Sequence, residues 1–237
     1  MKNYILITGG SGGIGSEILK HLYRDGFNII NIDKKKKNHK ISEFIKCDLS
    51  NQKSIIRIFK KLKNKNINAL INCAGVTLPG NTIRYSYKNW EKTFNINLNS
   101  AFICSQEVAK VMIKKKILGS IINISSISGH VVMPNSTAYN VSKAALIHLT
   151  KSLALDFSDY SIKVNSISPG YTKTNMTKKS WGNKKLRNIR TNKTILKRWA
   201  EPNSYNEAIS FLLKNPKSSY ITGTDIIIDG GWTIKGL

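Results

Sequence analysis

Residues 5–15 read Ile-Leu-Ile-Thr-Gly-Gly-Ser-Gly-Gly-Ile-Gly, and this stretch decides the fold of the chain. An apolar run that predicts a buried strand ends at Thr8, a glycine-rich loop follows it, and Gly15–Arg24 has the pattern of an amphipathic helix. Glycines permit a tight turn and a close backbone approach to a phosphate, while the N-terminus of a helix offers free N–H groups. A strand, a glycine loop and a helix in this order therefore predict a nucleotide-binding site. Its expected lining residues are Gly9, Ser11, Gly12, Gly13, Ile14 and Gly15.

The same alternation continues to the end of the chain. The apolar, β-branched runs that predict strands are Ile5–Thr8, Phe27–Ile32, Ala69–Cys73, Ser120–Ser125, Lys163–Ser168 and Thr224–Asp229. The amphipathic stretches that predict helices are Gly15–Arg24, Ser54–Lys63, Trp90–Lys114, Ala138–Phe157 and Ser204–Leu213. Strands that alternate with helices imply a parallel sheet covered on both faces. We therefore expect an α/β fold in which residues 1–237 form a single doubly wound domain with a central parallel sheet of about seven strands.

The composition excludes several classes of protein. With 41% hydrophobic and 8% aromatic residues, the 237-residue chain can bury a core, so we do not expect it to be disordered. The longest apolar runs span only a few residues, and Met1 leads straight into the first strand, so we predict neither a transmembrane helix nor a secretory signal. Cys47, Cys73 and Cys104 form neither a metal-binding spacing nor a disulfide framework. We therefore expect no metal site and a cytoplasmic location.

The formal net charge of +25 arises from 38 basic and 13 acidic residues. Of the basic residues, 32 are Lys and only 6 are Arg, whereas nucleic-acid readers depend on Arg for bidentate contacts. We interpret the charge as a solvated, lysine-rich surface that can attract polyanions without sequence specificity. We expect no specific nucleic-acid partner and no membrane partner.

The residue that ends the second predicted strand bears on the choice of dinucleotide. Asp33 follows Gly9 by twenty-four residues, and a carboxylate there can accept hydrogen bonds from the adenosine ribose hydroxyls. Because it would repel a 2′-phosphate, it favours NAD over NADP. Lys34 follows at once and could pair with a 2′-phosphate, so NADP stays possible.

The glycine spacing from Gly9 to Gly15 is Gly-x-x-x-Gly-x-Gly. This spacing, and further motifs from Ile5 to Trp232, resemble the classical short-chain dehydrogenase/reductase family, which has a Rossmann-type fold. The resemblance places Asp48, in Cys47-Asp48-Leu49, near the adenine ring. The other cofactor residues that the resemblance or the preceding reasoning indicates are Asp33, Leu49, Asn72, Ala74, Gly75, Tyr139, Lys143, Pro169, Gly170, Thr172 and Thr174.

Two of these segments are turns. Asn72-Cys73-Ala74-Gly75 matches the family's turn at the end of the fourth strand. In Pro169-Gly170-Tyr171-Thr172-Lys173-Thr174, the resemblance places Thr172 and Thr174 at the nicotinamide carboxamide and the phosphates. An ordinary turn with side-chain-to-backbone hydrogen bonds is the alternative for either threonine.

Four polar residues occupy the positions of the family's catalytic tetrad. Tyr139 and Lys143 are four residues apart, which puts them on one face of a helix. Ser126 precedes Tyr139 by thirteen residues at the end of a predicted strand, and Asn97 lies in the middle of predicted helix Trp90–Lys114. A free tyrosine is a poor base near neutral pH, and an adjacent ammonium together with the charge of the oxidised nicotinamide should lower its pKa.

Each member of the tetrad then has an expected role. Tyr139 is the general base in oxidation and the general acid in reduction, and Ser126 orients the substrate oxygen. Lys143 also holds the nicotinamide ribose. The resemblance implies that Asn97 holds a water that links Lys143 to solvent.

The stretch Lys173–Arg198 contains ten basic residues and no acidic one. It lacks strong periodicity, so we interpret roughly Asn175–Lys197 as an irregular substrate lid. Its charge could attract a phosphate-bearing substrate or could reflect the lysine-rich composition of the whole chain. Met176 and Trp181 could supply apolar contacts, and His130 could touch the substrate or be an ordinary loop residue.

The resemblance implies an NAD(P)(H)-dependent oxidoreductase that interconverts a carbonyl and a secondary alcohol of a small-molecule substrate, and it implies a homotetramer or homodimer. One alternative is a 3-oxoacyl-(acyl-carrier-protein) reductase using NADPH, which the basic lid favours and Asp33 disfavours. Another is a non-catalytic redox sensor or nucleic-acid-binding protein on the same fold. Such a protein could dispense with the tetrad, which is intact here.

Overall fold

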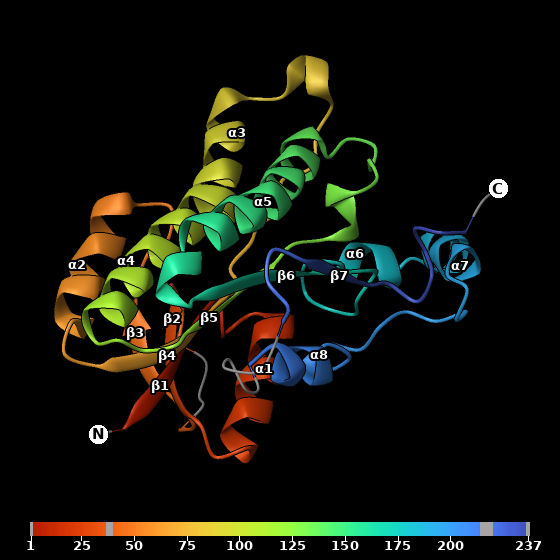
Figure 1. Ribbon diagram of the computed structural model, residues 1–237. Helices are drawn as coiled ribbons and strands as arrows, with labels where there is room; N and C mark the ends of the chain where they lie inside the picture. The colour runs from red at the N-terminus through yellow and green to blue at the C-terminus, as the bar shows by residue number, and fades with distance from the viewer. Residues whose placement is uncertain (1, 37–39, 214–219, 236–237) are drawn as a thin grey trace.

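A computed structural model describes residues 2–36, 40–213 and 220–235 of the protein. Within them lies a sheet of seven strands in the order β3-β2-β1-β4-β5-β6-β7, and all neighbouring strands are parallel (Figure 1). The strands are β1 (Asn3–Thr8), β2 (Asn28–Asp33), β3 (Glu43–Lys46), β4 (Asn66–Asn72), β5 (Ser120–Ile124), β6 (Lys163–Pro169) and β7 (Asp225–Ile228). The order reverses between β1 and β4, and a ligand crevice is expected at this point of a doubly wound sheet. The predicted fold class is confirmed.

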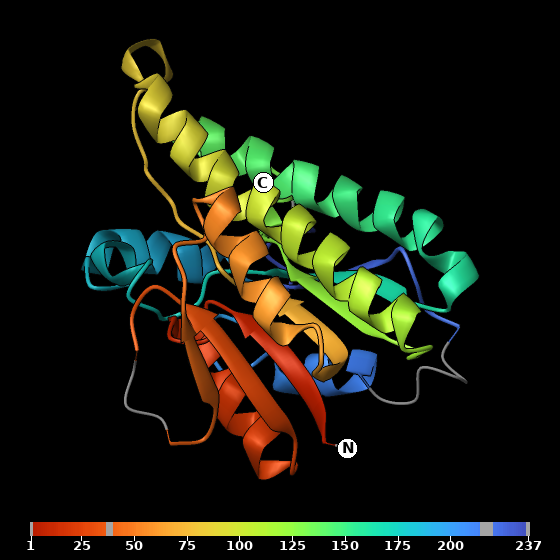
Figure 2. The same cartoon turned by 90° about the vertical axis from the view of Figure 1, so that its left-hand side faces the viewer.

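Helices cover both faces of the sheet, as the two views in Figures 1 and 2 show. They are α1 (Gly13–Arg24), α2 (Gln52–Leu62), α3 (Tyr87–Phe94), α4 (Ser100–Lys114), α5 (Thr137–Asp156), α6 (Lys178–Trp181), α7 (Lys184–Lys193) and α8 (Asn206–Leu213). Helices α2, α4 and α5 pack on one face, while α1 and α8 pack on the other. In the described part of the chain, no helix is both long and apolar enough to span a membrane.

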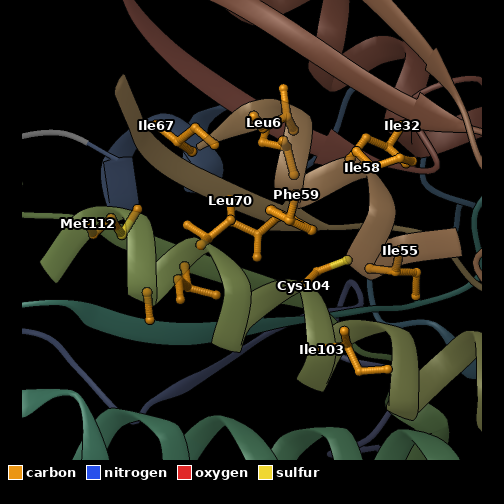
Figure 3. Close-up of a cluster of buried hydrophobic side chains, with 14 of the residues drawn as sticks. Leu6, Ile32, Ile55, Ile58, Phe59, Ile67, Leu70, Ile103, Cys104 and Met112 are labelled. Carbon is orange, nitrogen blue, oxygen red and sulfur yellow. The ribbon is translucent and has the colours of Figure 1, made fainter. Parts of the chain in front are cut away.

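The alternation of side chains along the strands produces two buried cores. Leu6 of β1 and Leu70 of β4 meet Phe59 of α2 on one face (Figure 3). Ile7, the neighbour of Leu6, points to the opposite face and belongs to the core that contains Ile18 of α1. Because both faces are buried, the central strands are apolar at consecutive positions rather than at every second one.

Strand β3 and the helix predicted over Trp90–Lys114 differ from the expectation. The edge strand β3 was not among the predicted runs, because only two of its four residues are apolar. The helix predicted over Trp90–Lys114 is interrupted: α3 ends at Phe94, a π-helical turn η2 (Asn95–Asn99) follows, and α4 then continues to Lys114. Single π-helical turns inside helices are often found at functional sites.

The prediction of an irregular lid over Asn175–Lys197 is wrong, because most of this stretch is helical. Helices α6 and α7 occupy most of it, beyond the ends of β6 and β7 (Figure 1). The side chain of Asn183 caps α7 by accepting the N–H of Leu186 at 3.1 Å. The sequence of α7 is too polar to show the apolar face that indicates a helix. The helix therefore depends on the Asn183 cap and on contacts with the rest of the protein, such as that of Arg190 with Tyr171.

Candidate active site

The glycine loop lies between β1 and α1, pressed against the end of β4. Gly9 has a φ of +71°, and a Cβ on it would lie 2.7 Å from the backbone of Ala74. A Cβ on Gly15 would overlap the carbonyl oxygen of Gly9. Helix α1 begins after Gly12 with no side-chain cap and no acidic residue in its first turn. The loop is therefore a cradle of backbone atoms around a free helix N-terminus, and this fits a dinucleotide pyrophosphate.

Asp33 ends β2 beside this cradle. Its Oδ2 accepts a hydrogen bond from the N–H of Ser11 at 3.0 Å, and its Oδ1 accepts one from the N–H of Lys35 at 3.2 Å. The hydroxyl of Ser11 donates to the carbonyl of Lys35 at 2.7 Å. The carboxylate is thus held at the loop as an acceptor, and the structure brings the predicted residues Ser11 and Asp33 together.

Lys34 turns toward a different acid. Its Nζ lies 2.9 Å from Oδ2 of Asp48, while Ser50 donates its N–H and its hydroxyl to Oδ1 of Asp48 at 3.0 and 2.7 Å. The hydrogen bonds from Ser50 and Lys34 lower the pKa of Asp48 to about 2. Asp48 is therefore ionised and engages the cation that could otherwise meet a 2′-phosphate.

Two of the predicted cofactor residues turn their side chains into the core. Leu49 belongs to the hydrophobic cluster on the α2 face. Asn72 is buried, and its Nδ2 donates to Oδ1 of Asn123 at 2.8 Å and to the hydroxyl of Ser105 at 3.1 Å. These bonds link β4 to β5 and α4, while Oδ1 of Asn72 is buried without a partner. Because the whole side chain is buried, the backbone of Asn72 is the part left for the predicted cofactor contact.

The turn after β6 reaches the cradle. Pro169 is the last residue of β6, and a Cβ on Gly170 would lie 2.6 Å from the Cα of Asp229. Thr174 lies directly against the glycine loop, because a Cβ on Gly13 would lie 2.6 Å from its Cγ2. Thr174 is therefore well placed for the predicted cofactor contact.

Thr172 is oriented differently from Thr174. It is 3% exposed, and its hydroxyl bonds to the hydroxyl of Tyr205 at 2.5 Å and to the carbonyl of Gly170 at 3.0 Å. Because the Thr172 hydroxyl bonds to groups inside the protein, only the backbone of Thr172 is left for the predicted cofactor contact.

Ser126, Tyr139 and Lys143 meet where β5 ends and α5 begins. Nζ of Lys143 lies 5.8 Å from the centroid of the Tyr139 ring, one helical turn away. Ser126 accepts the N–H of Ser128 at 3.1 Å, and a hydrogen bond joins its side chain to that of Tyr139. The structure thus brings together two hydroxyls and an ammonium in the arrangement that the sequence predicts.

Lys143 is buried, with 4% of its surface exposed, and its Nζ donates to the carbonyl of Ile124 at 2.8 Å. A Cβ on Gly75 would lie 3.6 Å from this Nζ, so the glycine leaves space beside the ammonium. Burial lowers the pKa of Lys143 to about 8, and the nearby Cys73 thiol partly opposes this effect. The charge of Lys143 is therefore more easily lost than that of an exposed lysine.

The electrostatics of Tyr139 correct one expectation. Burial raises the pKa of Tyr139, and the hydrogen bond with Ser126 lowers it only in part. The expected lowering by Lys143 is absent in this structure, where Nζ bonds to the carbonyl of Ile124. Tyr139 is therefore a neutral phenol here, which is the form that donates a proton.

Asn97 lies in the π-helical turn η2 and is 1% exposed. Its Oδ1 accepts the N–H of Val76 at 2.8 Å, and its Nδ2 donates to the carbonyl of Val76 at 3.0 Å and to the hydroxyl of Ser142 at 3.1 Å. The side chain fastens the segment after β4 to the catalytic helix α5. Both amide donors are used, so a water held by the Asn97 side chain would have to donate to Oδ1, which accepts one hydrogen bond here.

His130 is part of a hydrogen-bond network away from the catalytic hydroxyls. Its Nε2 lies 2.7 Å from Oδ2 of Asp225 and 3.3 Å from the hydroxyl of Ser168. The Asp225 carboxylate also accepts the hydroxyls of Ser166 and Ser168. The network ties the turn after Ser126 to β6 and β7, which supports the interpretation of His130 as an ordinary loop residue.

Sequence reasoning missed an aromatic cluster beneath the lid. The ring centroid of Tyr171 lies 5.2 Å from that of Trp199 and 5.6 Å from that of Trp232. Arg190 of α7 lies over this cluster, with Cζ 4.5 Å from the Tyr171 centroid. No spacing signals the cluster, because its members come from separate segments. Met176 is exposed and Trp181 half-buried, and their contacts with a substrate stay predictions.

Known proteins resemble this chain over almost its whole length. A family model described as enoyl-(acyl carrier protein) reductase matches residues 9–233. The NADH-dependent L-xylulose reductase of Ambrosiozyma monospora is 33% identical, with 96% of this chain and 94% of the relative covered. A 3-oxoacyl-(acyl-carrier-protein) reductase of Rickettsia typhi is 37% identical, with 95% of each chain covered. A structure of 4-hydroxyisoleucine dehydrogenase complexed with NADH superposes with a TM-score of 0.94 at 34% identity, covering 99% of this chain and all of that one.

Proposed function

The chain belongs to the short-chain dehydrogenase/reductase family, and from that premise we propose that it is an NAD(H)-preferring oxidoreductase that interconverts a carbonyl compound and a secondary alcohol. The observation that carries the proposal is the convergence of Ser126, Tyr139 and Lys143 at the end of β5, on the same edge of the sheet as the glycine cradle. A cradle alone would support any nucleotide-binding protein, whereas the three side chains supply the proton chemistry of an alcohol dehydrogenase.

We assign the cofactor contacts from the geometry of the cradle. The backbone of the loop and the N-terminus of α1 would hold the pyrophosphate, and Asp33 would accept the adenosine ribose hydroxyls. Lys143 would hold the nicotinamide ribose, and Thr174, which lies against Gly13, would contact the phosphates. The preference for NAD is supported by Asp33 and by the pairing of Lys34 with Asp48. The relatives named as NADH-dependent or complexed with NADH point the same way.

The side chains of the site move a proton and stabilise charge. When bound, the cofactor supplies or accepts the hydride. In reduction, the Tyr139 hydroxyl donates its proton to the substrate oxygen, and the Ser126 hydroxyl donates a hydrogen bond to the same oxygen. In oxidation, Tyr139 takes the alcohol proton as a phenolate. The hydrogen bond with Ser126 stabilises that phenolate against part of the cost of burial, and the positive charge of the oxidised nicotinamide would add to this effect.

We propose that the proton reaches solvent past Lys143. Gly75 has no side chain, and a Cβ on it would lie 3.6 Å both from Nζ of Lys143 and from Oδ1 of Asn97, so these two groups border the proposed route. Asn97 would take part by accepting a hydrogen bond from a water at Oδ1, which has one partner, the N–H of Val76, while both of its amide donors are used by Val76 and Ser142. Asn97 is thus also a positioning residue that fixes the catalytic helix.

The substrate in this proposal is a small polar carbonyl compound or alcohol. The similarity to an L-xylulose reductase and a 4-hydroxyisoleucine dehydrogenase supports this class. The second candidate is a 3-oxoacyl-(acyl-carrier-protein) reductase, which the 37% identical relative and the basic lid favour. The position of Asp33 in the cradle disfavours it if that activity is to run on NADPH. The retained catalytic geometry disfavours a non-catalytic sensor or nucleic-acid-binding protein.

We also propose that the protein is a homotetramer or homodimer of the cytoplasm. Exposed apolar side chains lie on α4 and α5 (Phe102, Val141, Leu155) and on α8 and β7 (Phe211, Ile227). Two such surfaces on opposite sides of one chain support assembly about two axes. The three unpaired cysteines support a reducing compartment.

The test is titration of the purified protein with NADH and NADPH, followed by nicotinamide fluorescence. We expect NADH to bind at least about tenfold more tightly, a difference of about 1.4 kcal/mol. Carbonyl reduction would then be assayed with small sugars, keto acids and a 3-oxoacyl thioester. Tighter NADPH binding with turnover of the thioester would favour the carrier-protein reductase, and binding of neither dinucleotide would contradict the proposed function.

A further inference from the structure

Arg190, on helix α7 of the predicted lid, packs against aromatic side chains. Its Cζ lies 4.5 Å from the centroid of the Tyr171 ring and 5.9 Å from that of Trp199. Trp199 and Trp232, which flank Tyr171, are 4% and 8% exposed. The guanidinium is therefore held over a rigid, buried aromatic cluster rather than extended into solvent.

Tyr171 connects this guanidinium to the segment that leads into α5, the helix that carries Tyr139 and Lys143. It directly follows Pro169-Gly170, the turn that reaches the cofactor cradle, and its hydroxyl donates to Sδ of Met133 at 3.3 Å. The carbonyl of Met133 in turn accepts Nδ2 of Asn140, the residue next to Tyr139, at 3.0 Å. Tyr171 thus spans from the cofactor turn to the segment that enters the catalytic helix, and Arg190 covers it from the lid side.

The charge of Arg190 has no acidic partner in the described parts of the chain. None of the ion pairs there involves it, and Lys173–Arg198 contains no acidic residue. Two lysines of neighbouring segments do have acidic partners, Lys34 with Asp48 and Lys173 with Glu201. The positive charge of Arg190 is therefore not neutralised by a carboxylate of the described residues.

The known contacts of Arg190 use little of its hydrogen-bonding capacity. It lies over two rings and makes a hydrogen bond with the Tyr171 hydroxyl, which together with its charge lowers the pKa of that phenol against the effect of burial. Ring contacts occupy the flat face of a guanidinium and leave donors at its edge. Such an edge matches the planar, bidentate geometry of an oxyanion. Nζ of Lys193, one turn further along α7, lies 4.4 Å from the centroid of the Trp232 ring and adds positive charge beside the aromatic cluster.

We propose that Arg190 is a specificity-determining residue that binds an oxyanion of the substrate, so that the alcohols and ketones turned over are small carboxylic or phosphoric acids. This rests on the proposed function, and it narrows the substrate class of the same site. Carboxylate and phosphate share the chemistry that Arg190 recognises, and the experiment separates them.

The experiment measures anion binding first, because binding needs no turnover. The NADH-saturated protein would be titrated calorimetrically with malonate, with inorganic phosphate and with malonamide as the uncharged control. We expect one of the anions to bind, malonamide not to bind, and Arg190→Gln to weaken anion binding at least about tenfold. Arg190→Lys should restore part of it. The anion that binds more tightly identifies the substrate as a carboxylate or a phosphoester.

Arg187→Gln is the matched control. Arg187 lies on the same helix, one turn before Arg190, and its guanidinium bonds to the carbonyl of Trp181 at 3.3 Å instead of lying over Tyr171. Its replacement removes the same charge from α7, so anion binding should stay near the wild-type level. Equal losses in Arg187→Gln and Arg190→Gln would mean a general effect of lid charge and would overturn the proposal.

Kinetics give a second readout. Keto acids such as 4-oxopentanoate would be compared with their amides, and we expect Arg190→Gln to raise KM for the acid while leaving kcat/KM for the amide unchanged. The proposal fails if both members of the pair lose activity equally, or if wild-type protein binds neither anion. Failure of the proposed function is distinct, since it would show as no NADH binding, and anion titration of the cofactor-free protein would then still test Arg190.

Discussion

The glycine cradle and the predicted lid are built from different atoms. In the cradle, backbone meets backbone: a Cβ on Gly9 would lie 2.7 Å from the backbone of Ala74. Beneath the lid, side chain meets side chain, with Arg190 over Tyr171 and Trp199. A backbone cradle can bind the part of a ligand that all relatives share. A lid held by side chains can change its specificity without a change of fold.

The largest expected effect is the loss of activity on replacing Tyr139, the candidate proton donor. Tyr139→Phe removes the proton donor and keeps the ring, so kcat should fall by about 10²- to 10⁴-fold. NADH affinity should fall much less than kcat, because the backbone cradle is kept and only the predicted contact of the Tyr139 hydroxyl with the cofactor is lost. Steady-state kinetics and nicotinamide fluorescence measure the two quantities. A variant that binds NADH and keeps most of its activity would disprove the assigned acid/base role.

The next effect tests whether backbone contact defines the cradle. Gly15→Ala places a methyl group on the carbonyl oxygen of Gly9, so we expect the loop to shift, NADH binding to be lost and the free energy of unfolding to fall by about 1–3 kcal/mol. Gly26→Ala is the control, because Gly26 has a φ of +83° but no atom within 4 Å of its Cβ position. It should also lose about 1–2 kcal/mol, from backbone strain alone, yet bind NADH normally. Normal NADH binding by Gly15→Ala would show that the cradle tolerates side chains.

A smaller effect should appear in the pH dependence of stability. The pKa of Lys143 is about 8 in the folded protein, below the ordinary lysine value of 10.5. Between these two values the unfolded chain holds a proton that the folded chain has lost, so Lys143 contributes a rise of the free energy of unfolding with pH across this window. The buried cysteines contribute a fall, because burial raises their pKa values above 9.0. The difference in the free energy of unfolding between wild type and Lys143→Met isolates Lys143, and it should rise in favour of wild type from pH 7 to pH 8.5 and pH 10 in urea denaturation.

The control for that series is Lys151→Met on the same helix. Lys151 is exposed, so its replacement should leave the slope of stability against pH unchanged. Parallel curves for wild type and Lys143→Met would contradict the assignment of a buried, easily deprotonated ammonium at the active site.

The smallest effect is expected at the rim of the cradle. Lys34 is largely exposed in its pair with Asp48, so Lys34→Gln should change the free energy of unfolding by less than about 1 kcal/mol at neutral pH. The pair stabilises the fold above pH 3.8, and its contribution should disappear as the pH falls toward 2 and Asp48 is protonated. Thermal melts of wild type and Lys34→Gln at pH 7 and pH 3 would measure the difference in stability and its decrease at low pH. A loss of several kcal/mol at pH 7 would show that the rim, and not only the backbone, holds the cradle together.

The parts of the molecule that were predictable are those fixed by local pattern. The strand before Gly9, the loop and the helix after it follow from apolar runs and glycines, and the spacing of Tyr139 and Lys143 follows from the helical repeat. The helical lid could not be predicted in the same way. Its helix α7 depends on the Asn183 cap and on contacts with distant rings, and neither leaves a periodic signal.

The sequence by itself determined the doubly wound sheet and the glycine loop at its first turn, and it singled out the candidate catalytic side chains. Only the tertiary structure decided how these side chains are used. It turned Thr172 toward Tyr205, bonded Lys143 to a strand carbonyl and left Arg190 unpaired over Tyr171. The physical reason is that strand and helix patterns express local periodicity and burial. A hydrogen-bond partner or a stacked charge depends instead on which residues from distant parts of the chain the fold brings within a few ångströms.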